Sequence, residues 1–188
     1  AARLVQQVHA WPERKLGERV TIVGHSQGGL DARWAVSRLD AAGLVSGLIT
    51  LSTPHRGTSL LDHLGRPVLD TVPRCKDVLE CMGIHTEAAI FLSCKYIQEN
   101  FNPNCPDVPD ITYHSFGGAR KSLLQYWTPF MPLQVLLARH EGPNDGLVSV
   151  QSARWGEYVA TIENDHVEMI NYPLKFGRAT PWELWDQV

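Results

Sequence analysis

Residues 20–30 read VTIVGHSQGGL, and this stretch decides the fold that we expect. Val20–Val23 is a short apolar run, typical of a strand buried on both faces of a sheet. From Leu30 to Leu39 apolar residues recur at helical spacing, and Gly43 is a plausible C-cap. The stretch therefore predicts a strand, a sharp turn and a helix in direct succession.

The turn of this stretch, Gly24-His25-Ser26-Gln27-Gly28, fits the pattern G-x-S-x-G. In that pattern a strained strand-to-helix turn, with a positive φ at the serine, exposes the serine hydroxyl in a cleft. Glycines two residues away on each side remove side chains that would clash. The N–H of Gln27, at the start of the helix, points toward a developing oxyanion. A phosphate-binding turn is the alternative, but neither G-x-G-x-x-G nor G-K-[ST] occurs here.

A serine nucleophile needs a base and an acid that orients the base. In hydrolases with this kind of turn the chain order is Ser, then Asp or Glu, then His. Asp145 in EGPNDGLV and His166 in ENDHVE follow the strands predicted at residues 135–138 and 158–162. Ligands bind at the carboxyl ends of such strands, so we expect Ser26, Asp145 and His166 to meet there.

Other residues compete for these roles. His55, His114 and His140 could be ordinary surface or capping histidines, and Asp165 adjoins His166 but is not expected to face it. The segment Asn-Asp-Gly around Asp145 is also a good turn sequence in its own right.

The remaining apolar patterns predict the rest of the fold. Residues 2–10 are expected to be a helix, and residues 45–51 a further strand beside those at 20–23, 135–138 and 158–162. Strands separated by helical stretches indicate an α/β fold with a mostly parallel sheet and helices on both faces.

Residues 58–110 are too long for an ordinary connection and predict an inserted helical subdomain, with a crossover helix and long loops as the alternative. The four cysteines, Cys75, Cys81, Cys94 and Cys105, all lie in it. They permit two local disulfides in three pairings, or four free thiols, and no C-x-x-C pair indicates zinc. Eight histidines, and no cysteine outside the insertion, favour an intracellular compartment, cytosolic or organellar.

Composition narrows the classes of function. A chain of 188 residues suits one domain, and its net charge of -3 gives no electrostatic case for nucleic acid or for a polybasic membrane anchor. No apolar run approaches the roughly 20 residues that span a bilayer. Trp182 and Trp185 are expected to pack a terminal helix onto the core, or to contact a lipid interface transiently. Nothing in the sequence indicates an oligomeric state.

Four motifs together resemble the α/β-hydrolase triacylglycerol lipases, the bacterial true lipases and their fungal relatives. They are GHSQGG at 24–29, TPHRGT at 53–58, NDGLV at 144–148 and Asp165-His166, and GPNDGLVSV with ARWG at 153–156 is most like the fungal members. The resemblance runs from about residue 18 to about residue 172 and is weakest between residues 60 and 105.

The resemblance implies a single lipase-like domain over residues 1–188, with residues 58–110 as its lid. It implies Ser26 as nucleophile, Asp145 as acid, His166 as base, and the Gln27 N–H in the oxyanion hole; His25 and Leu30 are expected to line the substrate pocket. The implied reaction is hydrolysis of a carboxylic ester, most simply a triacylglycerol. A phospholipase, a thioesterase, an acyltransferase and a non-catalytic binding protein or inactive fragment are the alternatives.

Two departures from the family pattern have consequences. Bacterial members often bind a structural calcium through an aspartate just after the histidine, but Glu168 stands there and residues 115–132 offer no second aspartate. No metal and no cofactor is therefore expected. Only 25 residues precede Ser26, so the resemblance implies that the family's first strands, and one oxyanion donor, are not in this chain.

Overall fold

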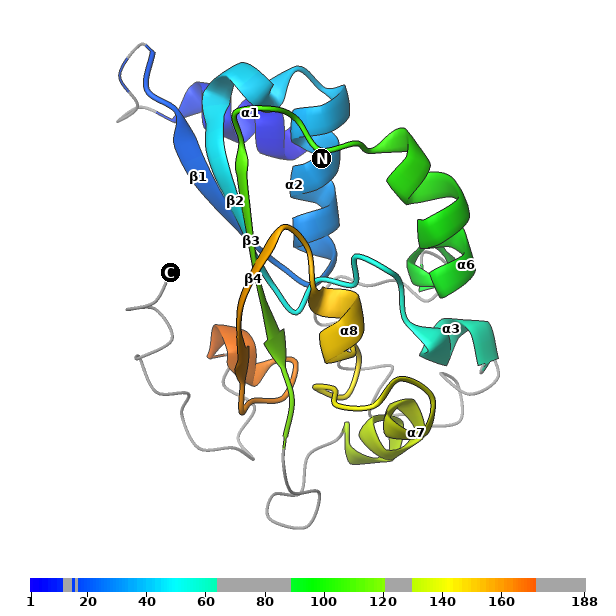
Figure 1. Ribbon diagram of the computed structural model, residues 1–188. Coiled ribbons are helices and arrows are strands. Elements are labelled where there is room, and N and C mark those ends of the chain that lie inside the picture. Colours follow the sequence, from blue (N-terminus) through cyan, green and yellow to red (C-terminus); the bar gives the residue numbers. More distant parts are fainter. Residues whose placement is uncertain (12–14, 16, 64–88, 121–129, 172–188) are drawn as a thin grey trace.

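The computed structural model describes residues 1–11, 15, 17–63, 89–120 and 130–171. Four strands form one sheet in chain order: β1 (Val20–His25), β2 (Val45–Leu51), β3 (Thr112–Gly118) and β4 (Glu157–Ile162). Each strand pairs in parallel with the next (Figure 1). The predicted parallel sheet is confirmed, and so are three of its predicted strands, which became β1, β2 and β4.

The strand predicted at residues 135–138 is wrong, because these residues lie in helix α7 (Met131–Glu141). The run Val135-Leu136-Leu137-Ala138 is too short to show a period of its own. The buried residues Leu133 and Leu137 lie four apart, which is the spacing of one helix face.

Strand β3, whose residues read TYHSFGG, was not predicted from the sequence. It lacks the branched apolar run of a typical interior strand, yet its last four residues are buried. Ser115 is fully buried, and its hydroxyl donates to the carbonyl of Trp155 at 2.7 Å. A tertiary partner therefore replaces the hydrophobic side chain that the sequence pattern would require.

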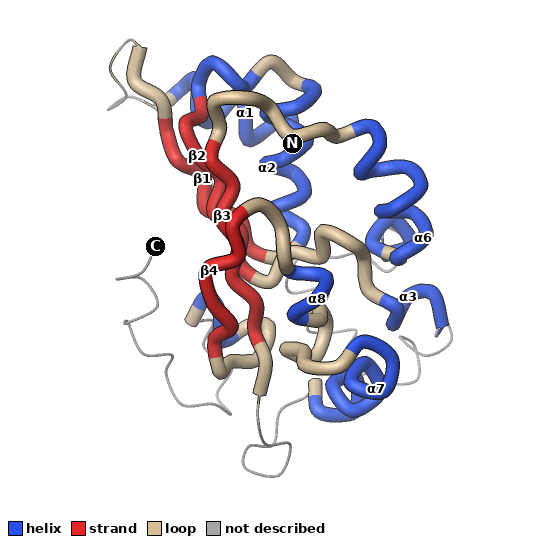
Figure 2. Tube along the Cα trace, in the orientation of Figure 1, coloured by secondary structure: helices blue, strands red, loops and turns tan. Residues whose placement is uncertain are grey.

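Besides α7, the longer helices are α1 (Ala2–Ala10), as predicted, and α2 (Gln27–Arg38). The shorter ones are α3 (Ser59–His63), α6 (Cys94–Tyr96) and α8 (Val150–Ala153). Figure 2 shows that the labelled helices lie on the same side of the sheet, whereas helices were expected on both of its faces. The expectation that Gly43 caps α2 is wrong, because the C-cap is Leu39. The left-handed residue that follows is Asp40, with φ 54°, and Gly43 lies in the 3-10 turn η1 (Ala41–Leu44).

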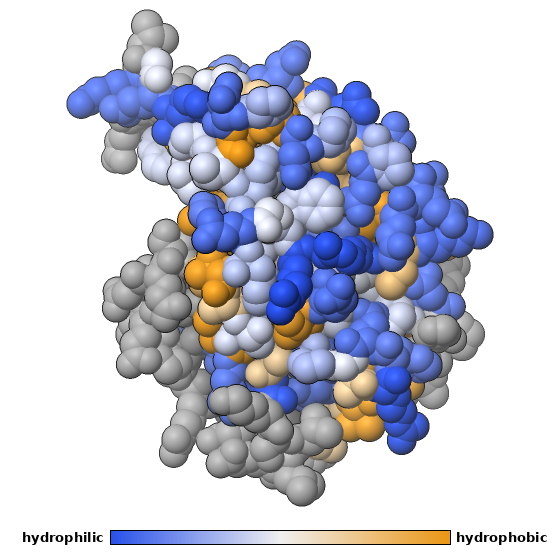
Figure 3. Space-filling model, in the orientation of Figure 1, coloured by the Kyte–Doolittle hydropathy of each residue, from blue (hydrophilic) through white to orange (hydrophobic). Residues whose placement is uncertain are grey.

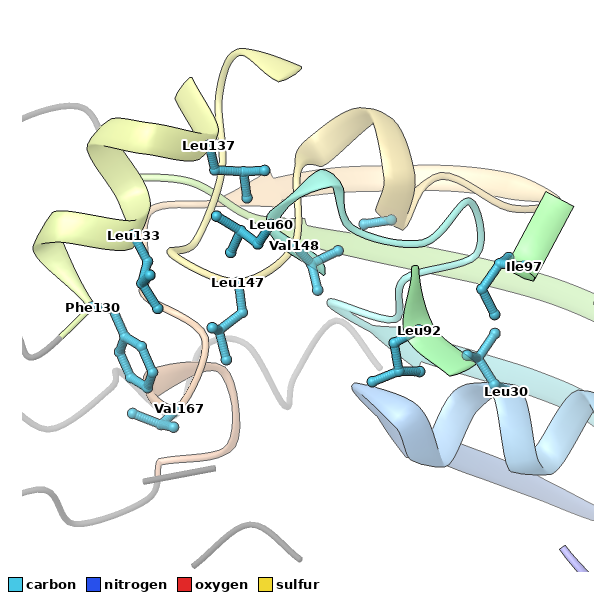
Figure 4. Close-up of a cluster of buried hydrophobic side chains, with 11 residues drawn as sticks. Leu30, Leu60, Leu92, Ile97, Phe130, Leu133, Leu137, Leu147, Val148 and Val167 are labelled. Atoms are coloured by element: carbon cyan, nitrogen blue, oxygen red, sulfur yellow. The ribbon is translucent and has the colours of Figure 1, made fainter. Parts of the chain in front are cut away.

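Two clusters of buried side chains fill the space between the helices and the sheet. One joins α2 to β1 and β2 through residues such as Ala35, Val36 and Leu48. The other reaches from α7, where Leu133 and Leu137 lie, to Leu30 on α2 (Figure 4). Most of the surface in Figure 3 is hydrophilic, with apolar side chains gathered along the strands.

The structure describes both ends of the predicted insertion at residues 58–110. Beyond α3 and α6, these ends form the 3-10 turns η2 (Ala89–Leu92) and η4 (Asn102–Asn104) and the π-helical turn η3 (Ile97–Phe101). Thr58 and Ser93 form an isolated parallel bridge, so the two ends meet. Cys94 and Cys105 are free thiols, whereas Cys75 and Cys81 lie outside the described residues.

The expectation for Trp182 and Trp185 also falls outside the described residues. Within the described part of the chain, no helix has both the length and the apolar character needed to span a bilayer.

Candidate active site

Ser26 occupies the turn between β1 and α2, with φ 54° and ψ −130°. A positive φ is strained for a residue with a Cβ, and such strain clusters at functional sites. The N–H of Ser26 donates to the carbonyl of Leu51 at the end of β2, at 2.9 Å. This bond fixes the turn to the neighbouring strand.

Of the two glycines that the turn was expected to require, Gly24 is confirmed and Gly28 is not. A Cβ on Gly24 would lie 2.7 Å from the Cα of Gly29, and a Cβ on Gly29 would lie 2.9 Å from the Cβ of Thr53. A Cβ on Gly28 would meet no atom within 4 Å. Close packing therefore requires glycine at positions 24 and 29, and the expectation for Gly28 is wrong.

His166 lies in the loop after β4 and reaches back to the turn. Its Nε2 is 2.9 Å from the Oγ of Ser26, and its ring is fully buried. The main-chain N–H of His166 donates to the carbonyl of Asp145 at 3.0 Å. The ring is thus held against the serine hydroxyl, and its backbone is tied to the loop that carries Asp145.

Asp145 combines the two roles that the sequence left open. Its Oδ2 is 2.8 Å from the Nδ1 of His166. Its Oδ1 accepts from the N–H groups of Leu147 and Val148 at 3.0 and 2.8 Å, so the side chain also closes the turn. Burial by itself raises the pKa of this carboxyl, but His166 and the two N–H donors lower that pKa overall. The imidazole of His166, oriented by the ionised carboxylate of Asp145, can therefore activate the hydroxyl of Ser26 as a nucleophile.

Gln27 is the first residue of α2, so its N–H lies at the positive end of the helix dipole. The first N–H groups of a helix have no acceptor within the helix. Gln27 therefore presents a donor next to Ser26, where an oxygen that gains negative charge would be stabilised.

His25 was expected to line a pocket, but its contacts are with His166. Its Nε2 is 2.8 Å from the His166 carbonyl, and the two ring centroids are 4.7 Å apart. Burial, and then the proximity of His166, lower the pKa of His25 to about 3. His25 is therefore neutral near pH 7 and donates to the carbonyl. Leu30 is buried in the cluster that contains Leu92 and Ile97 (Figure 4).

The competing residues take other places. His55 is not a surface residue: it is fully buried, it stacks on Trp155, and its Nε2 is 3.0 Å from the Thr50 Oγ. His114 is half-buried, with its Nδ1 3.5 Å from a carboxylate oxygen of Glu157, and His140 is exposed on α7. The Asp165 carboxylate accepts from the N–H groups of Val167 and Glu168.

Arg33 on α2, which the sequence did not single out, is only 1% exposed. Its guanidinium carbon lies 3.6 Å from the centroid of the Trp155 ring, and it donates to the Asn102 side chain at 3.0 Å and the Cys105 carbonyl at 3.1 Å. An arginine at a core-facing position of a predicted helix could have indicated a buried, paired cation, because arginine is seldom buried without a partner.

The described residues include no group of three or more His, Cys, Asp or Glu side chains placed to hold a metal ion. Glu168, at the position of the family's calcium aspartate, instead forms an ion pair with Arg120.

The known proteins that this chain resembles are described as thioesterases, lipases and esterases. A family model described as palmitoyl protein thioesterase matches residues 1–172. Triacylglycerol lipase 2 of Saccharomyces cerevisiae is 30% identical over 179 residues, which are 93% of this chain and 52% of the lipase. The chain thus spans about half the length of this curated relative.

Two solved structures share the fold. The mature form of Bacillus licheniformis lipase BlEst2 has a TM-score of 0.69 and 23% identity, and the match covers 93% of this chain and 68% of that one. The metagenomic carboxyl esterase MGS0156 has a TM-score of 0.70 and 21% identity, with 89% and 50% covered.

Proposed function

The chain belongs to the palmitoyl protein thioesterase family and has the α/β-hydrolase fold, and from this premise we propose that it is a serine hydrolase of carboxylic esters. One observation carries the proposal: an unbroken series of contacts links the Ser26 Oγ to the His166 Nε2, and the His166 Nδ1 to the Asp145 carboxylate. Ser26 follows β1 and His166 follows β4, at the carboxyl ends of these strands. Asp145 instead lies in the loop between α7 and α8, and this loop packs on the end of β3, where a Cβ on Gly118 would lie 2.8 Å from the Asp145 Cβ.

In the proposed reaction His166 is the general base. It takes the proton of Ser26 as the Oγ attacks the acyl carbonyl, and the Asp145 carboxylate holds the ring with its Nε2 directed at Ser26. The oxyanion that forms accepts from the Gln27 N–H. His166 then returns the proton to the leaving alcohol, which departs and leaves an acyl-enzyme. Water, activated by the same ring, hydrolyses the acyl-enzyme and restores Ser26.

The proposed substrate has a long acyl chain, in the first instance a triacylglycerol. The buried apolar cluster includes Leu147, Val167 and Leu30, each within four residues of Asp145, His166 or Ser26 (Figure 4). Apolar walls beside a reacting carbonyl suit an acyl chain. The name of the yeast relative points to the same substrate class.

Residues 58–110 would form the lid over this substrate. Two observations on the described ends support that role. Leu60, Leu92 and Ile97 belong to the same apolar cluster as Leu30, so the described ends of the segment pack beside the site. Ile90 and Phe91 are 64% and 52% exposed, which places apolar side chains where a lipid or an acyl chain could contact them.

A thioesterase is the second candidate, and the description of the matching family favours it. The same three residues serve both reactions, because each transfers an acyl group first to the serine and then to water. The difference lies only in whether an alcohol or a thiol leaves.

The test compares a long-chain triacylglycerol, a long-chain p-nitrophenyl ester and a palmitoyl thioester as substrates. The wild-type protein and Ser26→Ala are assayed in parallel, and a fluorophosphonate probe reports whether Ser26 is reactive. We expect the probe to label the wild type and not the variant, with the triacylglycerol hydrolysed faster than the thioester. The reverse preference would favour the thioesterase, and a folded wild type that neither labels nor hydrolyses any substrate would refute the proposed function.

A further inference from the structure

Arg120 follows β3 and contacts the loop that carries His166. Its Nη2 reaches both carboxylate oxygens of Glu168 and lies 3.8 Å from the Oδ2 of Asp165. The side chains of Arg120, Asp165 and Glu168 are 9%, 4% and 12% exposed. One buried cation therefore bridges two carboxylates that flank His166 in the sequence. The proposed reaction does not use any of these three side chains.

The two carboxylates also shape the backbone on both sides of His166. Asp165 Oδ1 accepts from the N–H groups of Val167 and Glu168, at 3.1 and 3.0 Å. In return the N–H of Asp165 donates to Glu168 Oε2 at 2.9 Å. This reciprocal pattern between Asp165 and Glu168 is that of a capping box, and it stands directly before the turn η5 (Glu168–Ile170). His166 thus lies inside a closed loop of hydrogen bonds whose acceptors are held together by Arg120.

The cluster would not hold without the cation. Two carboxylates that share a buried site repel each other, and one of them then retains a proton. Burial first, and then the charge of Glu168, already raise the pKa of Asp165 to about 6, while Arg120 acts in the opposite direction. Without Arg120 we expect that pKa to rise further, and the contact between Asp165 and Glu168 to loosen near neutral pH.

We propose that Arg120 is a positioning residue for His166, because by bridging Asp165 and Glu168 it fixes the loop that presents the imidazole to Ser26. The inference rests on the proposed role of His166 as general base. Arg120 acts through the two carboxylates, and it touches neither the substrate nor the reacting atoms. A loop displaced by about 1 Å can lower a rate by about 100-fold, so a contact of this kind has a measurable effect on catalysis.

The test uses the rate of fluorophosphonate labelling of Ser26, and kcat and KM for a p-nitrophenyl ester, each as a function of pH. For Arg120→Met we expect labelling and kcat to fall by up to about 100-fold with little change in KM. The acidic limb of the pH profile should move to higher pH, because the unbridged carboxylates hold a proton to higher pH and because a nearby positive charge has been removed.

Three further variants separate positioning from a general loss of structure. Arg120→Lys keeps the charge but not the planar two-donor geometry, so its rates should fall between those of the wild type and Arg120→Met. Adding Glu168→Gln to Arg120→Met removes one of the two opposed carboxylates and should recover part of the labelling rate. Arg139→Met, at an exposed arginine of α7, should match the wild type.

The outcomes are distinguishable. Wild-type rates and an unmoved acidic limb in both Arg120 variants would overturn the inference. So would a loss that is equal at every pH and is recovered by neither Lys nor Glu168→Gln. If Arg120→Met does not fold by circular dichroism, Arg120→Lys decides alone, since equality with the wild type overturns the inference. A wild type that neither labels nor hydrolyses points instead to failure of the proposed function itself.

Discussion

His25 lies between the Ser26 turn and the His166 loop, and its neutrality matters to both. Its Nε2 donates to the His166 carbonyl, and the two rings are in contact. A protonated His25 would repel the imidazolium that the proposed reaction forms on His166. Burial prevents this by lowering the pKa of His25 to about 3.

The lowered pKa of His25 predicts a pH dependence of stability. Because the unfolded chain binds a proton near the ordinary value of 6.5 and the folded chain does not until about 3, stability is lost as pH falls from 6.5 toward 3. This one group contributes a slope of at most about 1.4 kcal/mol per pH unit. We expect His25→Gln, which keeps a donor but cannot titrate, to reduce the slope of the unfolding free energy between pH 6 and pH 4.

Urea unfolding at several pH values measures that slope. His55 is also buried with a pKa well below its usual value, so the wild-type slope includes more than one group and only the difference between proteins isolates His25. His9→Gln, at an exposed position on α1, is the matched control. An identical slope for His25→Gln and the wild type would contradict the prediction.

At the scale of elements, the junction of β1 and α2 depends on close packing between backbones. The Cα of Gly24 and the first turn of α2 approach so closely that a Cβ at position 24 would lie 2.7 Å from Gly29. That neighbour is backbone, which cannot move without shifting the helix. The geometry of the Ser26 turn is therefore coupled to the start of α2.

Two alanine variants test this coupling. We expect Gly24→Ala to destabilise the protein by about 1–3 kcal/mol, the usual cost of an overpacked site. We also expect it to slow the labelling of Ser26. Gly28→Ala meets open space in a helix and should instead stabilise by about 0.5–1 kcal/mol, the usual gain of alanine over glycine. Thermal unfolding of the two variants compares them directly, and equal effects would show that the close approach is not a constraint.

At the scale of the whole molecule, Arg33 joins regions far apart in the chain. From α2 it donates to the side chain of Asn102 and the carbonyl of Cys105, and it stacks on Trp155. The end of the insertion and the segment before β4 are thereby attached to the helix that follows Ser26.

We expect Arg33→Leu to lower the free energy of unfolding substantially, because it leaves buried acceptors unpaired at about 1–3 kcal/mol each. Arg38→Leu is the matched control, since Arg38 is an exposed residue of the same helix that bonds to the nearby Asn104 carbonyl. Urea unfolding measures the free energy of unfolding of both variants. A similar small decrease in the two would mean that the contacts of Arg33 do not stabilise the fold.

Local patterns were sufficient for the features that depend on neighbours in the chain. The GHSQGG turn, the apolar runs of β1 and β2 and the periodicity of α1 and α2 could all be predicted, because each is set by sterics or by a repeat within a few residues. The chain order Ser, Asp, His also predicted three residues, Ser26, Asp145 and His166, that the structure brings into contact.

Other features were decided only by tertiary contacts. The run Val135–Ala138 is apolar enough for a strand and became part of α7, while the polar TYHSFGG became the interior strand β3. His55 is buried because Thr50 and Trp155 surround it, and Arg120 bridges carboxylates more than 40 residues later in the chain. Contacts between distant residues leave no period or motif in the local sequence, and the free energy of burial depends on which groups meet in space.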